Sequence, residues 1–401
     1  MENQQKESAI SKVPPEIWWP ILYYAFVPKF VMDEVYEGNN WIADAESMAC
    51  QSAPMRITKR KSQVCDLALV CKSWKHIVDQ TNRRFVPVGI DKLTPEGFKE
   101  AWRMDIGDLV ARSKFHDQLP KLVGAVVQWR ALCMDAKDAD HLSLLRFPHL
   151  RRLELYRNSS SDRRLSHPEN LVGVLKNFKG ALENLTWLEY RISGSMQAMV
   201  DDKVDSITLP NLQGLHYTIY HLFSLPYSRL ILPSLCHLHI RAHAGPKELL
   251  PLRQLVEAYG QTLQSLNLDI HLEDTSRMPE DSYFPPWERV ARLREFGLAA
   301  PALLHFPPLP SKHPLQIFAA QVWCVDGGLL SWLDSDNLKT IRLVNSRREA
   351  EGSLVPLDRT NMFWDSNRMR VIGPREMETL EAKARERGII LQSCSDPDGK
   401  L

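Results

Sequence analysis

Apolar positions in the second part of the chain recur in a short pattern: an apolar residue, two variable residues, an apolar residue, one variable residue and an apolar residue. Because alternate residues of a strand point to opposite sides, each copy predicts a short strand with one apolar side. No single strand can cover that side, so the pattern predicts stacked units that share a core and form a curved parallel sheet. The clear copies are Leu150/Leu153/Leu155, Leu185/Leu188/Tyr190, Leu212/Leu215/Tyr217, Leu235/Leu238/Ile240, Leu263/Leu266/Leu268, Leu293/Phe296/Leu298 and Leu338/Ile341/Leu343. With a weaker copy at Leu315 and Phe318, successive copies start 22 to 35 residues apart.

Helical segments are expected between some of these strands. Apolar spacings of three and four predict helices within 168–178, 246–259 and 327–333. The segment PREMETLEAKARERGIILQ predicts a charged helix and a short strand that cap the stack. We expect the first strand within 123–129, which is rich in valine, and a helix from Thr94 to about Phe115 before it.

Two further apolar stripes near the N-terminus predict a pair of short helices. They lie in 13–26, VPPEIWWPILYYAF, and in 64–78, VCDLALVCKSWKHIV. Helices of this length cannot bury their apolar sides alone, so each needs the other or a partner. Pro20 predicts a kink in the first helix, and the polar spacer 27–63 is expected to be an exposed inserted loop.

These two blocks resemble the F-box. The first resembles its opening, and LALVCKSWKHI resembles its close. The resemblance implies docking on a Skp-type adaptor that links the chain to a cullin. The adaptor-binding residues that it implies are Pro14, Ile17, Ile21, Leu67, Val70, Cys71 and Trp74. The alternative is that these residues only form a local helical core.

The whole pattern predicts an α/β protein in which an all-α F-box precedes an irregular solenoid that resembles leucine-rich repeats. The chain is similar in this respect to fungal-type F-box proteins with degenerate leucine-rich repeats. The expected organisation is a disordered N-terminus at 1–12, the F-box at 13–85, a helical linker at 86–120, the solenoid at 121–392 and a tail at 393–401.

Composition and charge limit the classes of partner and the cellular locations that the sequence predicts. The formal net charge is +1, which gives no reason to expect nucleic acid or an anionic membrane as a partner. No apolar run is long enough to predict a transmembrane helix, and the polar start MENQQKESAISK does not resemble a secretory signal. The seven cysteines are scattered without a CxxC pair, which indicates free thiols and a cytoplasmic or nuclear protein.

No motif indicates catalysis by this chain, so we expect no enzyme activity, catalytic residues or cofactor. His237, His239 and His243 alternate and would share one side of a strand, where metal binding is conceivable. No acid or cysteine completes the set at a suitable spacing. We therefore expect no metal site.

The positions between the buried apolar residues are expected to point outward and to bind a target protein. Aromatic and arginine side chains among them are typical of protein interfaces. The residues expected to bind the target are Glu154, Tyr156, Trp187, Glu189, Arg191, His216, His237, His239, Arg241 and Asn267. The sequence thus predicts a substrate-recognition adaptor of an SCF-type (cullin-RING) ubiquitin ligase. The alternatives are a solvated face and a non-ligase interaction scaffold with a degenerate F-box.

Overall fold

A computed structural model describes 95–101, 103–106, 109–158, 171–178, 180–193, 206–219, 229–244, 249–272, 287–298, 308–321, 329–344, 346–348, 354–356 and 374–393. The predicted N-terminal tail, F-box helices, spacer and C-terminal tail lie outside these residues, except for Ser393. The description below therefore concerns the sheet and the helices around it.

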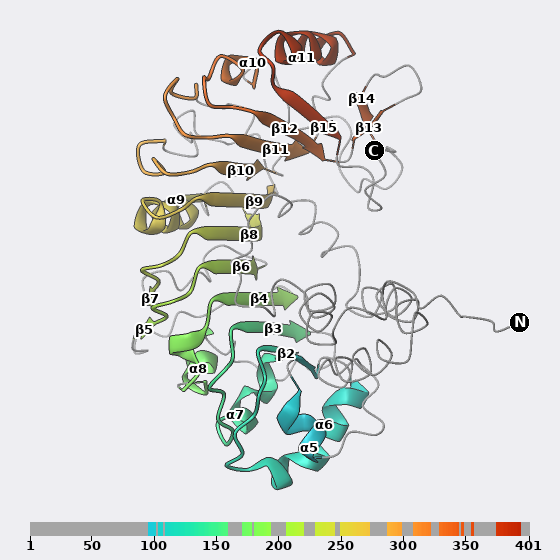
Figure 1. Cartoon of the computed structure of the whole chain (residues 1–401), viewed down its shortest axis with the longest axis vertical. Helices are drawn as coiled ribbons and strands as arrows, with labels where there is room; N and C mark the ends of the chain where they lie inside the picture. Colours follow the sequence, from blue (N-terminus) through green and yellow to red (C-terminus); the bar gives the residue numbers. More distant parts are fainter. Residues whose placement is uncertain are drawn as a thin grey trace, which may run out of the picture.

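The described part is a mixed α/β structure built on one parallel sheet. Eleven of its strands form this sheet, every neighbouring pair is parallel, and the spatial order follows the chain order (Figure 1). The strands are β1 (Arg103–Asp105), β2 (Ala131–Asp135), β3 (Arg152–Asn158), β4 (Trp187–Ser193), β6 (Gly214–Ile219), β8 (His237–Ala244), β9 (Ser265–Leu272), β10 (Glu295–Leu298), β11 (Ile317–Gln321), β12 (Thr340–Val344) and β15 (Ile390–Ser393).

The apolar pattern sets the register of the sheet. Leu153 pairs with Leu188, which pairs with Leu215, and equivalent apolar positions continue through Phe296 and Ile341. These side chains are at most 2% exposed and belong to one core. The seven predicted strands are confirmed. The weaker copy is confirmed as β11, where Phe318 occupies the middle apolar position and buried Ala320 the last.

A tight turn precedes most of these strands, and it explains the prolines of the pattern. The N–H of the first leucine donates to the carbonyl three residues earlier, as Leu150 does to Phe147, Leu212 to Leu209 and Leu235 to Leu232. Pro148, Pro210 and Pro233 occupy the second position of these turns. Proline is favoured there because its fixed φ matches the turn.

Two repeated sets of hydrogen bonds join each unit to the next. The carbonyl of the residue before a strand accepts two consecutive N–H groups from the following unit, as Arg151 O does from Thr186 (2.8 Å) and Trp187 (3.0 Å). The same arrangement recurs from Arg130 to Gln316. A second ladder uses the side chain before the first leucine, which donates to the previous turn. Its members are Asn184 to Pro148 O, Asn211 to Glu183 O, Ser234 to Pro210 O and Asn337 to His313 O.

The sheet starts earlier than the sequence predicts, so two predictions near 120 are corrected. The expected helix from Thr94 to about Phe115 is divided into α5 (Pro95–Glu100) and α6 (Leu109–Leu122), with β1 between them. The linker at 86–120 thus contains a strand of the sheet. Met104 and Ile106 alternate toward the core, and Ile106 N–H donates to Cys133 O. This period of two favours a strand over a helix.

The first strand after α6 is not 123–129. Val123 and Gly124 form a turn with Gly124 at φ 73°, and the strand is β2. The buried residues of this unit are Trp129, Leu132 and Met134, which repeat the pattern with Trp in place of the first leucine. Trp129 Nε1 donates to Phe98 O at 2.5 Å, which gives the buried indole its partner.

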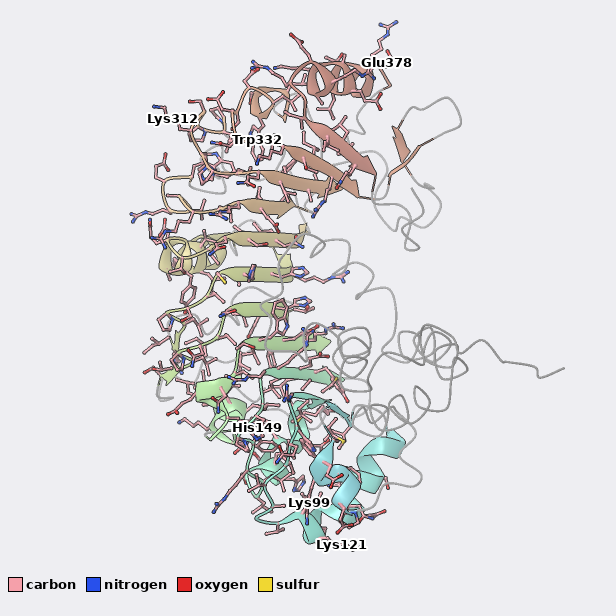
Figure 2. The ribbon with its side chains drawn as sticks, viewed as in Figure 1. Lys99, Lys121, His149, Lys312, Trp332 and Glu378 are labelled. Carbon is pink, nitrogen blue, oxygen red and sulfur yellow. The ribbon has the colours of Figure 1, made fainter. Side chains whose placement is uncertain are left out.

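The remaining elements are short. The predicted helices are observed as α8 (Leu171–Lys176), α9 (Leu249–Tyr259) and α10 (Leu329–Trp332). In Figure 1, α8 and α9 lie near the side at which the strands begin. Trp332 of α10, which is labelled in Figure 2, packs against Trp287, Phe296 and Phe318. The other elements are η2 (Ala136–Asp138), α7 (Ala139–Leu142), η3 (Leu182–Asn184), the paired strands β5 (Ile207–Thr208) and β7 (Leu230–Ile231), and the hairpin of β13 (Ser346–Arg348) and β14 (Leu354–Pro356).

The two ends of the sheet are covered by helices (Figure 1). Helices α5 and α6, which carry Lys99 and Lys121, lie at one end, and α11 (Pro374–Glu386), which carries Glu378, lies at the other (Figure 2). The chain leaves α11 through Gly388 at φ 69° and adds β15 beside β12. The predicted C-terminal helix and strand are thus observed.

Within the described residues, no helix combines the length and apolar character needed to cross a membrane.

Candidate protein-binding face

Three columns of side chains cross β3, β4, β6, β8 and β9 on the side opposite the buried leucines. The register places Glu154, Glu189, His216, His239 and Asn267 in line. A column before it contains Arg152, Trp187, Gly214, His237 and Ser265, and a column after it contains Tyr156, Arg191, Thr218 and Arg241. We call these columns the polar face. All ten predicted target-binding residues belong to it.

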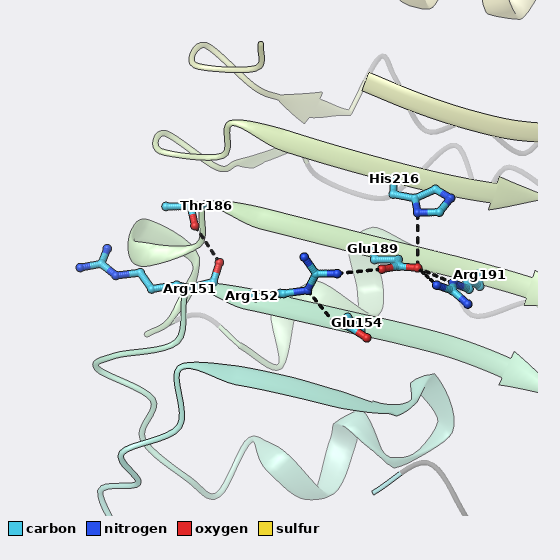
Figure 3. A network of polar contacts seen from close by, with 7 residues as sticks. All are labelled: Arg151, Arg152, Glu154, Thr186, Glu189, Arg191 and His216. Carbon is cyan, nitrogen blue, oxygen red and sulfur yellow. Dashed lines mark hydrogen bonds and ion pairs between the residues drawn. The ribbon is translucent and has the colours of Figure 1, made fainter. Parts of the chain in front are cut away.

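Glu189 is the centre of a charged network in this face (Figure 3). Its carboxylate accepts from Arg152 Nη2 at 3.3 Å, lies against the guanidinium of Arg191, and lies 3.3 Å from His216 Nδ1. Arg152 also donates to Glu154 through Nε at 2.6 Å. Two guanidinium groups therefore share two carboxylates across β3 and β4, and the pairs fix one another's positions.

The network keeps the buried carboxylate ionised. Burial by itself raises the pKa of Glu189, because an apolar environment disfavours the charged form. Attraction to His216, followed by Arg191 and Arg152, outweighs burial and holds this pKa well below its ordinary value. Burial also opposes the charge of Arg191, but Glu189 and Glu154 raise its pKa.

Trp187 lies between Arg152 and the glycine of the next strand. Arg152 Cζ lies 5.1 Å from the centre of the Trp187 ring, a cation–π contact. On the other side, a Cβ on Gly214 would lie 2.1 Å from Trp187 Cε3. Gly214 is therefore the residue that lets the indole lie against β6.

Histidines continue the central column beyond Glu189. The rings of His216 and His239 stack with centroids 4.1 Å apart and an angle of 8° between their planes. Burial lowers the pKa of His237, and burial together with His216 lowers the pKa of His239 well below its ordinary value. His239 is therefore neutral. It stacks on His216, which interacts with Glu189.

The polar face is more deeply packed than the sequence predicts. The exposed fraction is 2% for Glu189, 5% for His239, 7% for Asn267 and 9% for His237. Neighbouring parallel strands lie about 4.8 Å apart, so long side chains in one column contact each other. These four residues lie opposite the buried leucines as predicted, and their burial argues against the alternative of a solvated face at these positions.

A smaller set of side chains in this face reaches solvent. The Arg191 side chain is 42% exposed, and those of Glu154 and His216 are 16% and 12% exposed. Tyr156, Trp187 and Arg241 are also partly exposed. The partly exposed Arg191, Tyr156 and Trp187 are residue types that suit contact with a carboxylate or a peptide segment.

Among the described residues of the face, no three His, Cys, Asp or Glu side chains bring their ligand atoms close enough to hold a metal ion. The side chain of His243 lies outside the described residues, so the predicted histidine row is observed only at His237 and His239. The one His/Cys/Asp/Glu group in the described part that could hold a metal ion is His116, Asp138 and His141, away from this face.

Sequence reasoning found the columns but not all their members. Cys133 pairs with Glu154, and Ala319 and Gln392 continue the central column after Gly297. The unit of Cys133 was missed because Trp129 replaces the first leucine of the pattern, whereas the strands of Ala319 and Gln392 were expected but were not assigned to the columns. The predicted adaptor-binding residues Pro14, Ile17, Ile21, Leu67, Val70, Cys71 and Trp74 lie outside the described residues.

Comparison with known proteins adds no family assignment. No protein-family model matches the chain, and no curated protein matches it.

Proposed function

We propose that this chain is a substrate-recognition adaptor of an SCF-type (cullin-RING) ubiquitin ligase. The N-terminal blocks would bind a Skp-type adaptor, and through it a cullin, while the sheet would bind a target protein. The sheet would belong to a solenoid of the leucine-rich-repeat type. The chain itself would position the target and leave catalysis to other subunits.

The observation that carries the proposal is the one-strand-per-unit sheet joined to F-box-like sequence blocks. Its units share the apolar pattern, the turn and the hydrogen bonds to the next unit, as expected for stacked repeats. Such stacks commonly bind proteins through an extended face. The partly exposed Tyr156, Trp187, Arg191 and Arg241 supply residue types that contribute strongly at interfaces.

The second candidate is an interaction scaffold whose F-box no longer docks. Pro20 and the long spacer 27–63 favour it, because both depart from the F-box pattern. Co-purification of the full chain with a Skp-type adaptor separates the two. We expect the adaptor to bind the wild type and not Trp74→Ala or Ile21→Asp, because a charge in an apolar helix interface lacks a partner. Equal binding by all three chains would contradict docking through these blocks.

The target-binding half of the proposal needs a separate test. Targets captured by the wild type would be assayed with Arg191→Ala and with Trp187→Ala/Arg191→Ala. We expect target binding to fall while adaptor binding stays unchanged. Arg191→Ala also loses the ion pair with Glu189, so its melting temperature should fall, and binding is compared at a temperature at which every variant is folded. The matched control is Arg292→Ala, an exposed arginine away from the polar face. Loss of target binding in the control but not in Arg191→Ala would place the contact elsewhere.

A further inference from the structure

A cluster of two imidazoles and one carboxylate lies at the N-terminal end of the sheet. It consists of His116 of α6, Asp138 at the end of η2 and His141 of α7. One ligand atom from each residue lies within 4.8 Å of the others. None of these residues belongs to the polar face.

The geometry of the cluster is close to that of a metal site. His116 Nε2 lies 3.5 Å from Asp138 Oδ1, and the rings of His116 and His141 meet edge to face with centroids 4.9 Å apart. Ligands about 2.1 Å from a tetrahedral ion are separated by about 3.4 Å. His141 is exposed, so a turn of its side chain can close the remaining separation.

The surrounding structure fixes two of the three groups. The Asp138 side chain is only 3% exposed, and it lies just after β2. Phe115, next to His116, is fully buried against Trp129 with ring centroids 6.3 Å apart, which fixes α6 at this point. Asn177 Nδ2 donates to Asp140 Oδ1 at 2.7 Å and ties α7 to the next unit. Because His116 and Asp138 are already in place and only His141 has to turn, metal binding would need little rearrangement.

We propose that His116, Asp138 and His141 bind one zinc ion. Two imidazoles and a carboxylate suit Zn²⁺ and not Mg²⁺ or Ca²⁺, which prefer oxygen ligands. The exposed side of the cluster leaves the fourth position to water. The ion joins α6 to the turn after β2, so it stabilises the end of the sheet that α5 and α6 cover (Figure 1). Asp138 and His141 are three residues apart, about one helical turn, whereas His116 lies 22 residues before Asp138.

The test uses the full chain, freed of metal with a chelator and titrated with ZnCl₂ or MgCl₂. We expect Zn²⁺ to slow amide hydrogen exchange in α6 and α7 and to raise the melting temperature, with no effect of Mg²⁺. Localised exchange is needed because the seven cysteines can also bind zinc. His116→Gln/His141→Gln should lower the affinity measured at α6 and α7 at least about tenfold. His149→Gln, an exposed histidine outside the cluster, should behave as wild type.

Two further variants keep the outcome decisive. His141→Cys should retain protection by Zn²⁺, because a thiolate is also a zinc ligand, whereas His141→Gln should lose it. Because the native cysteines can also bind Co²⁺, the readout is the difference between the two chains: His141→Cys should show a stronger thiolate-to-cobalt band than the wild type. Unchanged exchange of α6 and α7 with Zn²⁺, or equal protection of the double variant, would show that His116 and Asp138 form only an ion pair.

Discussion

At the scale of single residues, the charge of Glu189 has the largest expected effect on stability. Glu189→Gln keeps the size of the side chain but removes the carboxylate charge that Arg152 and Arg191 share. Breaking a buried charge network by removing one partner costs about 3–5 kcal/mol. We expect a loss of about that size in the free energy of unfolding, measured by urea denaturation at pH 7.5.

The matched control for this prediction is Glu154→Gln. This carboxylate also pairs with Arg152, but its side chain is 16% exposed against 2% for Glu189. Solvent can replace part of the stabilisation that the Glu154 carboxylate provides. Glu154→Gln should therefore lower the free energy of unfolding less than Glu189→Gln does. An equal or greater loss for Glu154→Gln would mean that Glu189 is not the centre of the network.

His239 gives the second prediction at this scale, on pH dependence. Its pKa in the folded protein lies well below the ordinary value of 6.5, because burial and His216 oppose its charge while Glu189 favours it. Below about pH 6.5 the unfolded chain takes up a proton that the folded protein does not bind. Folding stability therefore falls as the pH drops from 6.5 toward the folded pKa. His239→Gln should lose less stability than the wild type between pH 7.5 and 5.5, and an identical pH profile would contradict this.

Glu295 should change the pH dependence of folding stability in the opposite direction to His239. Burial raises its pKa from 4.5 to about 7, although Arg342 lowers it in part. Between these two values the unfolded chain has released a proton that the folded protein still holds. Stability therefore falls as the pH rises from 4.5 to about 7. Glu295→Gln should remove this loss, so its stability relative to wild type should increase from pH 5 to pH 8. A constant difference over this range would show that Glu295 titrates normally.

At the scale of elements, the sequence predicted strands where leucine fills the pattern and failed where another residue does. The strands β3, β4, β6, β8, β9, β10 and β12 were found because their apolar residues are spaced identically and a leucine fills the first position. The strands β1 and β2 were missed because Ala101 and Trp129 occupy the first apolar position, and Ala101 leaves no visible stripe. The spacing of apolar residues within one segment cannot reveal such a strand, because it is recognised only by its pairing with the next segment.

The candidate site shows the same limit. Alternation placed all ten residues in the correct columns, because each strand keeps the register set by its leucines. It did not predict that Glu189 and His239 are buried, since burial depends on which side chains meet across strands. Gly214 illustrates this, because only its pairing with Trp187 reveals why glycine is required there.

The C-terminal helix and strand give a prediction for an element. Strand β15 pairs with β12, while Leu380, Ala384 and Ile389 are buried against the core. Lys383 and Arg387 reach Asp334 at 3.1 and 3.0 Å. A chain that ends at residue 373 exposes the edge of β12, and open strand edges promote association. We expect it to aggregate in size-exclusion chromatography, whereas a chain ending at Ser393 should elute as the full chain does. Equal elution of both would mean that β12 needs no cover.

At the scale of the whole molecule, stability should vary along the sheet. Each strand pairs only with its two neighbours, and no contact joins β1 to β12. Opening an end strand breaks one interface, whereas opening a central strand breaks two. Amide hydrogen exchange should therefore be slowest in β4, β6, β8 and β9 and faster toward β1 and β15.

A central core substitution tests whether this gradient comes from the stack. Leu215→Ala in β6 should cost about 2–5 kcal/mol, because it removes a buried side chain and leaves a cavity. We expect faster exchange in β4, β6 and β8, with a much smaller change in β12, which lies five strands away in the sheet order. Ile341→Ala in β12 should give the reverse pattern. If either substitution accelerates exchange equally in every strand, the described part unfolds as one cooperative unit, and the nearest-neighbour account of its stability is wrong.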